Sequence, residues 1–284
     1  MLLEKDNLFN IFPSKIIVFI LLVIIFSCTL GAENSNDLYN KSISAFDDLF
    51  IARRIIFGDK EELDKNIPDL SLSILNKDEL SILRNCVYAK HGYIFNSEKL
   101  KAYFSKFNWY KPEYKNVDKF LTDTDRTNIE HIKKYENIRN RNFSPEENPF
   151  ANFSGIVWHK SKIVAAGYDD SFFFYSDGTV SFRFNENDRK KTFIGFDGNF
   201  SVSSDTLRIE VKKLYLDEIF LDFNQFDGIG IETLDFMESR PIILILQEPL
   251  ILYFPFERPQ KIDFYDLRLN RISIGTTEYF NGNR

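Results

Sequence analysis

The sequence predicts an α+β protein in which a small helical module precedes an antiparallel β-barrel or β-sandwich. Apolar residues follow a helical period from Asp37 to Asn140, and a period of two prevails beyond residue 150. Between these halves, residues 141–150 hold two prolines and few apolar side chains, which predicts a linker. We therefore expect a helical region at 29–140 and an all-β domain at 151–284, after an N-terminal segment at 1–28.

The N-terminal segment has the pattern of a signal peptide. An unbroken apolar run from Ile16 to Phe26 follows Lys5 and Lys15. A membrane-spanning helix needs about 20 apolar residues, so this shorter run suits the central region of a signal peptide. We expect residues 1–28 to direct export to the cell envelope.

Two cleavage sites fit this segment. Ile25-Phe26-Ser27-Cys28 resembles a bacterial lipobox, which predicts lipidation of Cys28. Acyl chains contribute about 0.8 kcal/mol per buried CH₂, so such a group would hold the protein on a membrane without a spanning helix. Alternatively, Leu30-Gly31-Ala32 would serve an ordinary signal peptidase and leave Glu33 as the first residue. The sequence favours the lipid anchor and leaves open whether the inner or the outer membrane holds it.

Charge and cysteine usage narrow the class of protein. The net charge is −6 and no basic block is present, so nucleic acid is not an expected partner. Cys28 and Cys86 are the two cysteines, and lipidation of Cys28 would exclude an intrachain disulfide. We expect Cys86 to be a small buried apolar residue. Aromatic residues make up 16% of the chain and predict a large aromatic core.

The first half contains several helix boundaries. A first amphipathic helix ends near Gly58. Asn76 and Glu79 have the spacing of a capping box and open a second helix, and Gly92 suits a left-handed helix stop. The stop separates this helix from the next, so we expect two short helices in place of a single long one.

Further signals mark the remaining helices. Ser97 or Asn96 would cap a third helix, and Pro112 ends its pattern. Thr122 and Asp125 would open a last helix, which carries an apolar stripe on one side.

Three short motifs occur in order along these helices. Tyr88-Ala89-Lys90-His91-Gly92 follows Arg84-Asn85, then come Trp109-Tyr110-Lys111-Pro112 and Asn128-Ile129-Glu130-His131-Ile132. Together they resemble the YARHG domain, a small extracellular module of bacterial envelope proteins, over about residues 74–136. The resemblance implies a helical module in an envelope (lipo)protein.

Lys90 departs from the family motif, which has arginine at this position. Lysine keeps the positive charge but lacks the planar fork that binds a carboxylate with two parallel hydrogen bonds. If the family arginine pairs with a carboxylate, we expect a different or weaker pairing here.

The second half reads as short strands with regular turns. Phe172–Tyr175 and Thr179–Phe184 flank an Asp-Gly turn, and Thr192–Phe196 and Asn199–Val202 flank another, which predicts two hairpins. Such regular spacing predicts a single curled antiparallel sheet. Further apolar runs occur at residues 207–211, 219–223, 242–246, 250–254, 262–264 and 272–274.

The sequence lacks the usual motifs of enzymes and metal sites. The three histidines, His91, His131 and His159, have no metal-ligand spacing. No nucleophile elbow, P-loop or dinucleotide fingerprint occurs. The acidic residues between Asp222 and Asp235 predict a solvated loop, with weak calcium binding as the alternative. We therefore expect no catalytic residues, no metal and no cofactor.

The motif residues nevertheless have two interpretations. His91 would either bind free carbonyls at the helix end or act as a general base, and the structural role is favoured. Trp109 and Tyr110 would either close the core or form an exposed binding platform. The candidate site residues are Cys28 for lipidation, Tyr88, Ala89, Lys90, His91 and Gly92 of the motif, and Trp109 and Tyr110 for binding.

Two functions from different classes follow. The first is a non-catalytic cell-envelope lipoprotein, held on the membrane by its lipid. Its helical module would bind peptidoglycan or an envelope protein, and its β-domain would either act as a scaffold or bind a small apolar ligand. The second is an envelope hydrolase with a site between the two domains, in which His91 acts as base with an acidic residue of the β-domain. A third and less favoured idea is an outer-surface adhesin, since lipidated envelope domains often face outward. We favour the first.

Overall fold

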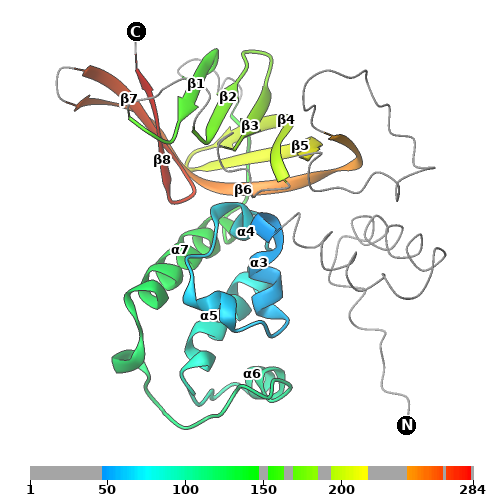
Figure 1. Cartoon of the computed structure of the whole chain (residues 1–284), viewed down its shortest axis with the longest axis vertical. Coiled ribbons are helices and arrows are strands. Elements are labelled where there is room, and N and C mark those ends of the chain that lie inside the picture. The colour runs from blue at the N-terminus through cyan, green and yellow to red at the C-terminus, as the bar shows by residue number, and fades with distance from the viewer. Residues whose placement is uncertain are drawn as a thin grey trace.

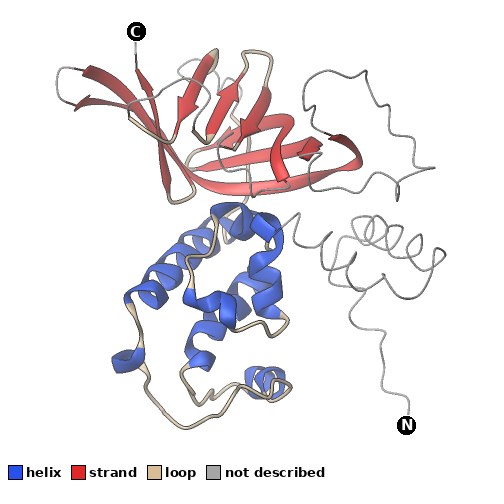
Figure 2. Cartoon of the chain, viewed as in Figure 1, coloured by secondary structure: helices blue, strands red, loops and turns tan. Residues whose placement is uncertain are grey.

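The computed structural model describes residues 47–146, 153–162, 169–184, 193–216, 242–264 and 267–282. Over these residues the chain forms a helical module followed by a closed antiparallel barrel (Figure 1). Helices and strands are segregated into two layers, with the barrel above the helices in Figure 2. The α+β class is confirmed. The signal peptide, Cys28 and the acidic loop within 217–241 lie outside the described residues.

The helical module buries a single apolar core. Ile55, Leu63, Leu83 and Ile132 come from different helices and are all fully buried. Cys86 is also buried and unpaired, as predicted, and burial raises the pKa of its thiol. The elements are α3 (Asp47–Ile56), η1 (Glu61–Asp64), α4 (Asp69–Ser73), α5 (Lys77–Lys90), α6 (Glu98–Phe104), η2 (Asp118–Phe120) and α7 (Asp123–Arg139).

The helix starts agree with the sequence signals. Asn76 and Glu79 form a reciprocal capping box at the start of α5, and Thr122 and Asp125 form one at the start of α7. Of the two candidates for the cap of α6, the side chain that accepts the hydrogen bond is that of Ser97. Residues 141–146, after α7, lie in neither a helix nor a strand.

Each barrel strand pairs with the next along the chain, and β1 pairs with β8 to close the sheet. This is the up-and-down arrangement, and the closing pair joins His159 of the first strand to Phe280 of the last. The strands are β1 (Ile156–His159), β2 (Ser171–Phe174), β3 (Thr179–Arg183), β4 (Phe193–Ser203), β5 (Thr206–Leu216), β6 (Ile242–Phe264), β7 (Leu267–Ile274) and β8 (Thr277–Gly282).

Aromatic side chains fill the barrel. Phe172 lies 4.6 Å from Phe182 and 5.1 Å from Tyr279 between ring centroids, and all three are at least 94% buried. Trp158 is fully buried, and its indole nitrogen donates to the carbonyl of Phe153 at 3.0 Å. These contacts favour a packed scaffold over a ligand-binding interior, because the rings are buried and in contact with one another.

The second predicted hairpin is wrong. Asp197 and Gly198 lie inside the single long strand β4, and the turn to β5 falls at Ser204 and Asp205. A Cβ on Gly198 would lie 2.3 Å from the carbonyl oxygen of Glu210, so glycine permits a close strand approach here. The register shift between Asp197 and Gly198 marks a bulge, which uses the same residue types as a turn.

Strand β6 also differs from the expectation of separate short runs. The segments 242–246, 250–254 and 262–264 belong to this single strand, although Pro249 and Pro259 interrupt the apolar pattern. Register shifts with β5 and β7 fall around these two prolines, so neither has to supply a ladder hydrogen bond there. The β6 strand pairs with β5 through Pro255 and with β7 from Phe256 onward.

The two parts meet where α4 and the end of α7 approach β6, β7 and β8 (Figure 1). The carboxylate of Asp69 at the start of α4 accepts hydrogen bonds from the Thr276 backbone and hydroxyl and from the Thr277 hydroxyl, all at 3.0 Å. It also accepts one from the buried Tyr135 hydroxyl at 2.8 Å. Gly275, in the β7–β8 turn, leaves the space that this junction needs.

We predict that Gly275→Ala opens this junction. Gly275 has φ +69°, and a Cβ there would lie 2.4 Å from Asp69 and 2.6 Å from the Tyr135 hydroxyl. We expect a loss of about 3 kcal/mol in the free energy of unfolding, from left-handed strain together with steric overlap. Urea unfolding followed by circular dichroism measures the loss.

The matched control is Gly155→Ala. Gly155 has φ +73°, but a Cβ on this residue would meet nothing within 4 Å. This variant therefore isolates the backbone strain, at about 1 kcal/mol. Equal losses in the two variants would contradict a tight junction at Gly275.

Candidate functional site

The YAKHG motif is itself the stop of helix α5. The Gly92 N–H donates to the Ala89 carbonyl at 2.9 Å, and the Tyr93 N–H donates to the Tyr88 carbonyl at 3.2 Å. This pair of hydrogen bonds, with Gly92 at φ +75°, is the Schellman motif. Tyr88, Ala89 and Gly92 therefore terminate the helix. The same turn sets the orientation of the two polar residues of the motif, Lys90 and His91.

The Trp109–Pro112 turn packs directly on the helix stop. The carbonyl of Gly92 accepts from the N–H groups of Glu113 at 2.8 Å and Tyr114 at 2.9 Å. A Cβ on Gly92 would lie 2.7 Å from the carbonyl oxygen of Lys111. The first and second motifs are thus joined through backbone, which explains why only glycine fits at this position.

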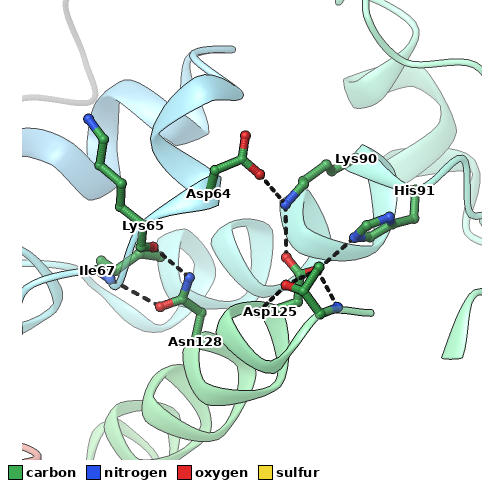
Figure 3. A network of polar contacts seen from close by, with 8 residues as sticks. Asp64, Lys65, Ile67, Lys90, His91, Asp125 and Asn128 are labelled. Atoms are coloured by element: carbon green, nitrogen blue, oxygen red, sulfur yellow. Dashed lines mark hydrogen bonds and ion pairs between the residues drawn. The ribbon is translucent and has the colours of Figure 1, made fainter. Parts of the chain in front are cut away.

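The polar residues of the motif converge on one buried carboxylate. Asp125, in the first turn of α7, has a side chain that is 0% exposed. It accepts from Lys90 Nζ at 3.0 Å and from His91 Nε2 at 2.8 Å (Figure 3). The backbone N–H and the hydroxyl of Thr122 donate to it at 2.8 and 2.9 Å. An ionised carboxylate only accepts, so His91 Nε2 carries the hydrogen in this contact.

Lys90 bridges two carboxylates. Its ammonium lies 2.7 Å from Asp64 Oδ1 in η1 and 3.0 Å from Asp125 Oδ1 (Figure 3). A lysine ammonium can donate to two acceptors in different directions, whereas an arginine fork favours one carboxylate in plane. Lys90 therefore does pair with carboxylates, as expected for this position. The pairing differs from that of an arginine, because the ammonium contacts one carboxylate in η1 and another in α7.

Asn128, of the third motif, ties the segment after η1 to α7. Its side chain is buried, accepts from the Ile67 N–H at 3.0 Å and donates to the Lys65 carbonyl at 2.9 Å (Figure 3). From the sequence, Asn128 is expected in a motif and Asp125 in a helix cap, but neither expectation includes the contacts that join distant segments. The capping-box spacing identifies Asp125 as a cap. Its contacts with Lys90 and His91 depend on residues far away in the sequence.

An open pocket of about 290 Å³ lies beside His91. The side chains of Tyr114 and Phe120 are 40% and 36% exposed, and their rings lie 4.8 Å apart. The pocket is lined by Lys90, His91, Gly92, Trp109, Lys111, Glu113, Tyr114 and Phe120.

The structure separates the two aromatic candidates of the second motif. Tyr110 is 9% exposed, and its hydroxyl donates to the Tyr93 carbonyl at 2.8 Å. Trp109 lines the pocket while its indole N–H donates to the Gly58 carbonyl at 2.8 Å and its ring stacks on Phe107. Tyr110 thus belongs to the core, and Trp109 links the core to the pocket wall.

The charges of the network stabilise one another. Burial would raise the pKa of Asp125, but hydrogen bonds from Thr122, Lys90 and His91 outweigh it and hold that pKa below its usual value. Burial would lower the pKa of Lys90, and the carboxylates of Asp64 and Asp125 raise it instead. The carboxylate and the ammonium are therefore both charged at neutral pH.

The described residues contain neither a metal-ion site nor a membrane-spanning helix. They contain no group of three or more His, Cys, Asp or Glu side chains that could hold a metal ion. None of the helices in the described ranges is long and apolar enough to cross a membrane.

The comparison with known families gives one match. Residues 54–137 match the family model of the YARHG domain. This matched segment begins in α3 and ends near the end of α7. The matched segment starts well before residue 74, where the motifs alone placed it, and so includes η1 and α4. The YARHG domain is an extracellular-type domain. No curated protein and no solved structure matches the chain.

We predict that Asp125→Asn destabilises the helical module. The amide would place a donor against Lys90, His91 and Thr122 and remove the negative charge that pairs with Lys90. Removing one member of a buried ion pair costs about 3 kcal/mol, which urea unfolding at pH 7 measures. The exposed Asp123→Asn, in the same helical turn, is the control and should cost less than about 1 kcal/mol.

The pH dependence of this difference follows from the lowered pKa of Asp125. A carboxyl whose pKa is lower in the folded state contributes stability above its unfolded pKa of about 3.9. That contribution is lost as the pH falls through the folded pKa. The gap between wild type and Asp125→Asn should therefore narrow below about pH 4, and a constant gap would contradict this assignment.

Proposed function

We propose that this protein is an exported, lipid-anchored cell-envelope protein whose helical module binds a cell-wall or protein partner without catalysis. The observation that carries the proposal is the use of the motif residues. Lys90 and His91 both bind the buried Asp125, and both line an open pocket whose lining also includes three aromatic residues. The network thus holds a preformed recess, which is the usual basis of a binding site.

The recess has the composition of a recognition surface. Exposed Tyr114 and Phe120 line the pocket together with Lys111, whereas Lys90 is already paired with two carboxylates. Lys119 lies over the Phe120 ring at 4.8 Å. Aromatic rings offer a large contact area at low entropic cost, and the cations favour partners that carry carboxylates. Peptidoglycan combines sugar rings with peptide carboxylates, so it is the partner that we place first, ahead of an envelope protein.

The geometry favours binding over the hydrolase alternative. That alternative pairs His91 with an acidic residue of the β-domain, whereas the carboxylate that contacts His91 is Asp125 of α7. The pocket beside His91 is lined by residues 90–120 of the helical module. The barrel meets the other end of α7, a 17-residue helix about 25 Å long at 1.5 Å per residue (Figure 1).

The barrel then serves as a scaffold and the lipid as the attachment. The packed aromatic interior and the Asp69 junction make the barrel a firm base for the helical module. Acylation of Cys28 would tether this body to a membrane through the polar segment that follows.

We predict that the double variant Tyr114→Ala/Phe120→Ala loses binding to purified peptidoglycan sacculi. The chain from Glu33 onward should pellet saturably with sacculi, and removal of both rings should weaken the interaction at least about tenfold, as for paired aromatic anchors. Co-sedimentation at increasing sacculus concentration measures the change.

The control for this experiment is Phe57→Ala/Tyr175→Ala. These aromatic side chains are 37% and 41% exposed, which matches the tested pair, and neither lines the pocket. The control should pellet like the wild type. Equal pelleting of both double variants would remove this pocket as the wall-binding surface, and no pelleting of the wild type would direct the search to protein partners.

The lipid anchor gives a separate prediction. Cys28→Ala in the full-length chain should move the protein from the membrane to the soluble fraction of fractionated cells, because no acceptor for the lipid remains. Cys86→Ala, which alters the buried thiol, is the control and should stay with the membrane. Membrane association that persists in Cys28→Ala would exclude this anchor.

A further inference from the structure

A second pocket, of about 320 Å³, lies at the junction of the helical module and the barrel. It is situated between the end of α7 and the β4–β5 turn, far from the His91 pocket at the start of the same helix. Its lining residues are Ile138, Arg139, Arg141, Asn142, Phe143, Ser203, Ser204, Asp205, Thr206 and Tyr253.

Arg139 lines this pocket and is held in place by two contacts. One guanidinium nitrogen donates to the Ser73 carbonyl at 2.6 Å, and the guanidinium plane lies over the Tyr253 ring at 3.9 Å. Its Nε is buried and has no hydrogen-bond partner in the described part of the chain. The side chain is thus fixed in place while one of its donors is unused.

No carboxylate lies within ion-pair distance of Arg139 among the residues that the structure describes. Glu79, which acts on it electrostatically, is itself paired with Arg53 at 3.2 Å. Asp205, on the pocket rim, is paired with Arg141. Glu79 and Asp205 are therefore both paired with arginines other than Arg139.

An unpaired, largely buried cation is costly, since desolvation is not repaid by an opposite charge. Burial lowers the pKa of Arg139 to about 10, only partly offset by Tyr253, Tyr135 and Glu79, so it is still charged at neutral pH. An anion in the pocket would supply the missing charge beside the guanidinium. Guanidinium groups bind carboxylates and phosphates through paired hydrogen bonds.

We propose that this junction pocket binds a small molecule through its carboxylate or phosphate group, with Arg139 as the principal contact. The rim offers further donors in the Ser204 hydroxyl and the Asn142 amide. Phe143 and Tyr253, whose rings meet edge to face at 5.9 Å, provide an apolar wall for the rest of the ligand. Because the lining comes from both α7 and the barrel, the ligand would also stabilise the junction.

The test is thermal unfolding of the chain from Glu33 onward, titrated with defined anions at constant ionic strength. One arm compares N-acetylmuramate with the neutral N-acetylglucosamine, which lacks the carboxylate. Another compares glycerol phosphate with glycerol, and inorganic phosphate serves as the bare oxyanion. We expect a rise in Tm of about 3 °C with a fitting anion and none with its neutral counterpart. The larger of the two shifts identifies a carboxylated sugar or a phosphorylated polyol as the source.

Variants of Arg139 decide whether this residue is the contact. Arg139→Met should abolish the anion response, and Arg139→Lys, which keeps a charge and a donor for the Ser73 carbonyl, should weaken the affinity about tenfold. Arg126 is the control, because it also lies in α7 and donates to a carbonyl, that of Asp118 at 2.7 Å, but is exposed. Arg126→Met and Arg126→Lys should respond like the wild type.

The proposal is overturned if no anion raises the Tm of the wild type, or if the shift is equal in wild type and in both Arg139 variants. If Arg139→Met does not fold, the response of Arg139→Lys alone decides between these outcomes. Sacculus binding through the His91 pocket does not enter this measurement, so either proposal can fail without the other.

Discussion

The carboxylate of Asp125 is the contact on which the helical module depends. It is completely buried. Its oxygens accept hydrogen bonds from Lys90 and His91 at the end of α5 and from Thr122 at the cap of α7, and Lys90 also pairs with a carboxylate of η1. A charge in this position is stable only because donors surround it, so the three segments cannot separate without exposing an unpaired charge. The motif residues are therefore a structural unit first, and the pocket beside them is shaped by that unit.

A second carboxylate has the same role at the other end of the module. Asp69 accepts from Thr276 of the β7–β8 turn, from Thr277 at the start of β8 and from the buried Tyr135 of α7. In both places one acidic side chain satisfies several donors that come from distant parts of the chain. The helical module is thus fixed internally by Asp125 and to the barrel by Asp69, and the two pockets lie at the opposite ends of α7.

The two pockets differ in what their cations already bind. Next to the His91 pocket, Lys90 is neutralised by Asp64 and Asp125, so the proposed recognition there rests on exposed rings and on Lys111. At the junction, Arg139 is held by a carbonyl and a ring but has no carboxylate among the described residues. The first suits an extended partner at an open surface, and the second suits a small anion in a recess.

Local sequence determined the helix caps, the Gly92 stop, the change from helical to alternating apolar pattern and the α+β class, because each depends on neighbouring residues and on burial of one face. It predicted Asp197-Gly198 as a turn and split β6 at its prolines, because a bulge and a turn use the same residue types and only the partner strand distinguishes them. Tertiary structure alone decided that Lys90 and His91 share the carboxylate of Asp125 and that Arg139 faces a junction pocket. Those contacts join residues 34, 35 and 66 positions apart, and no local pattern encodes such distances.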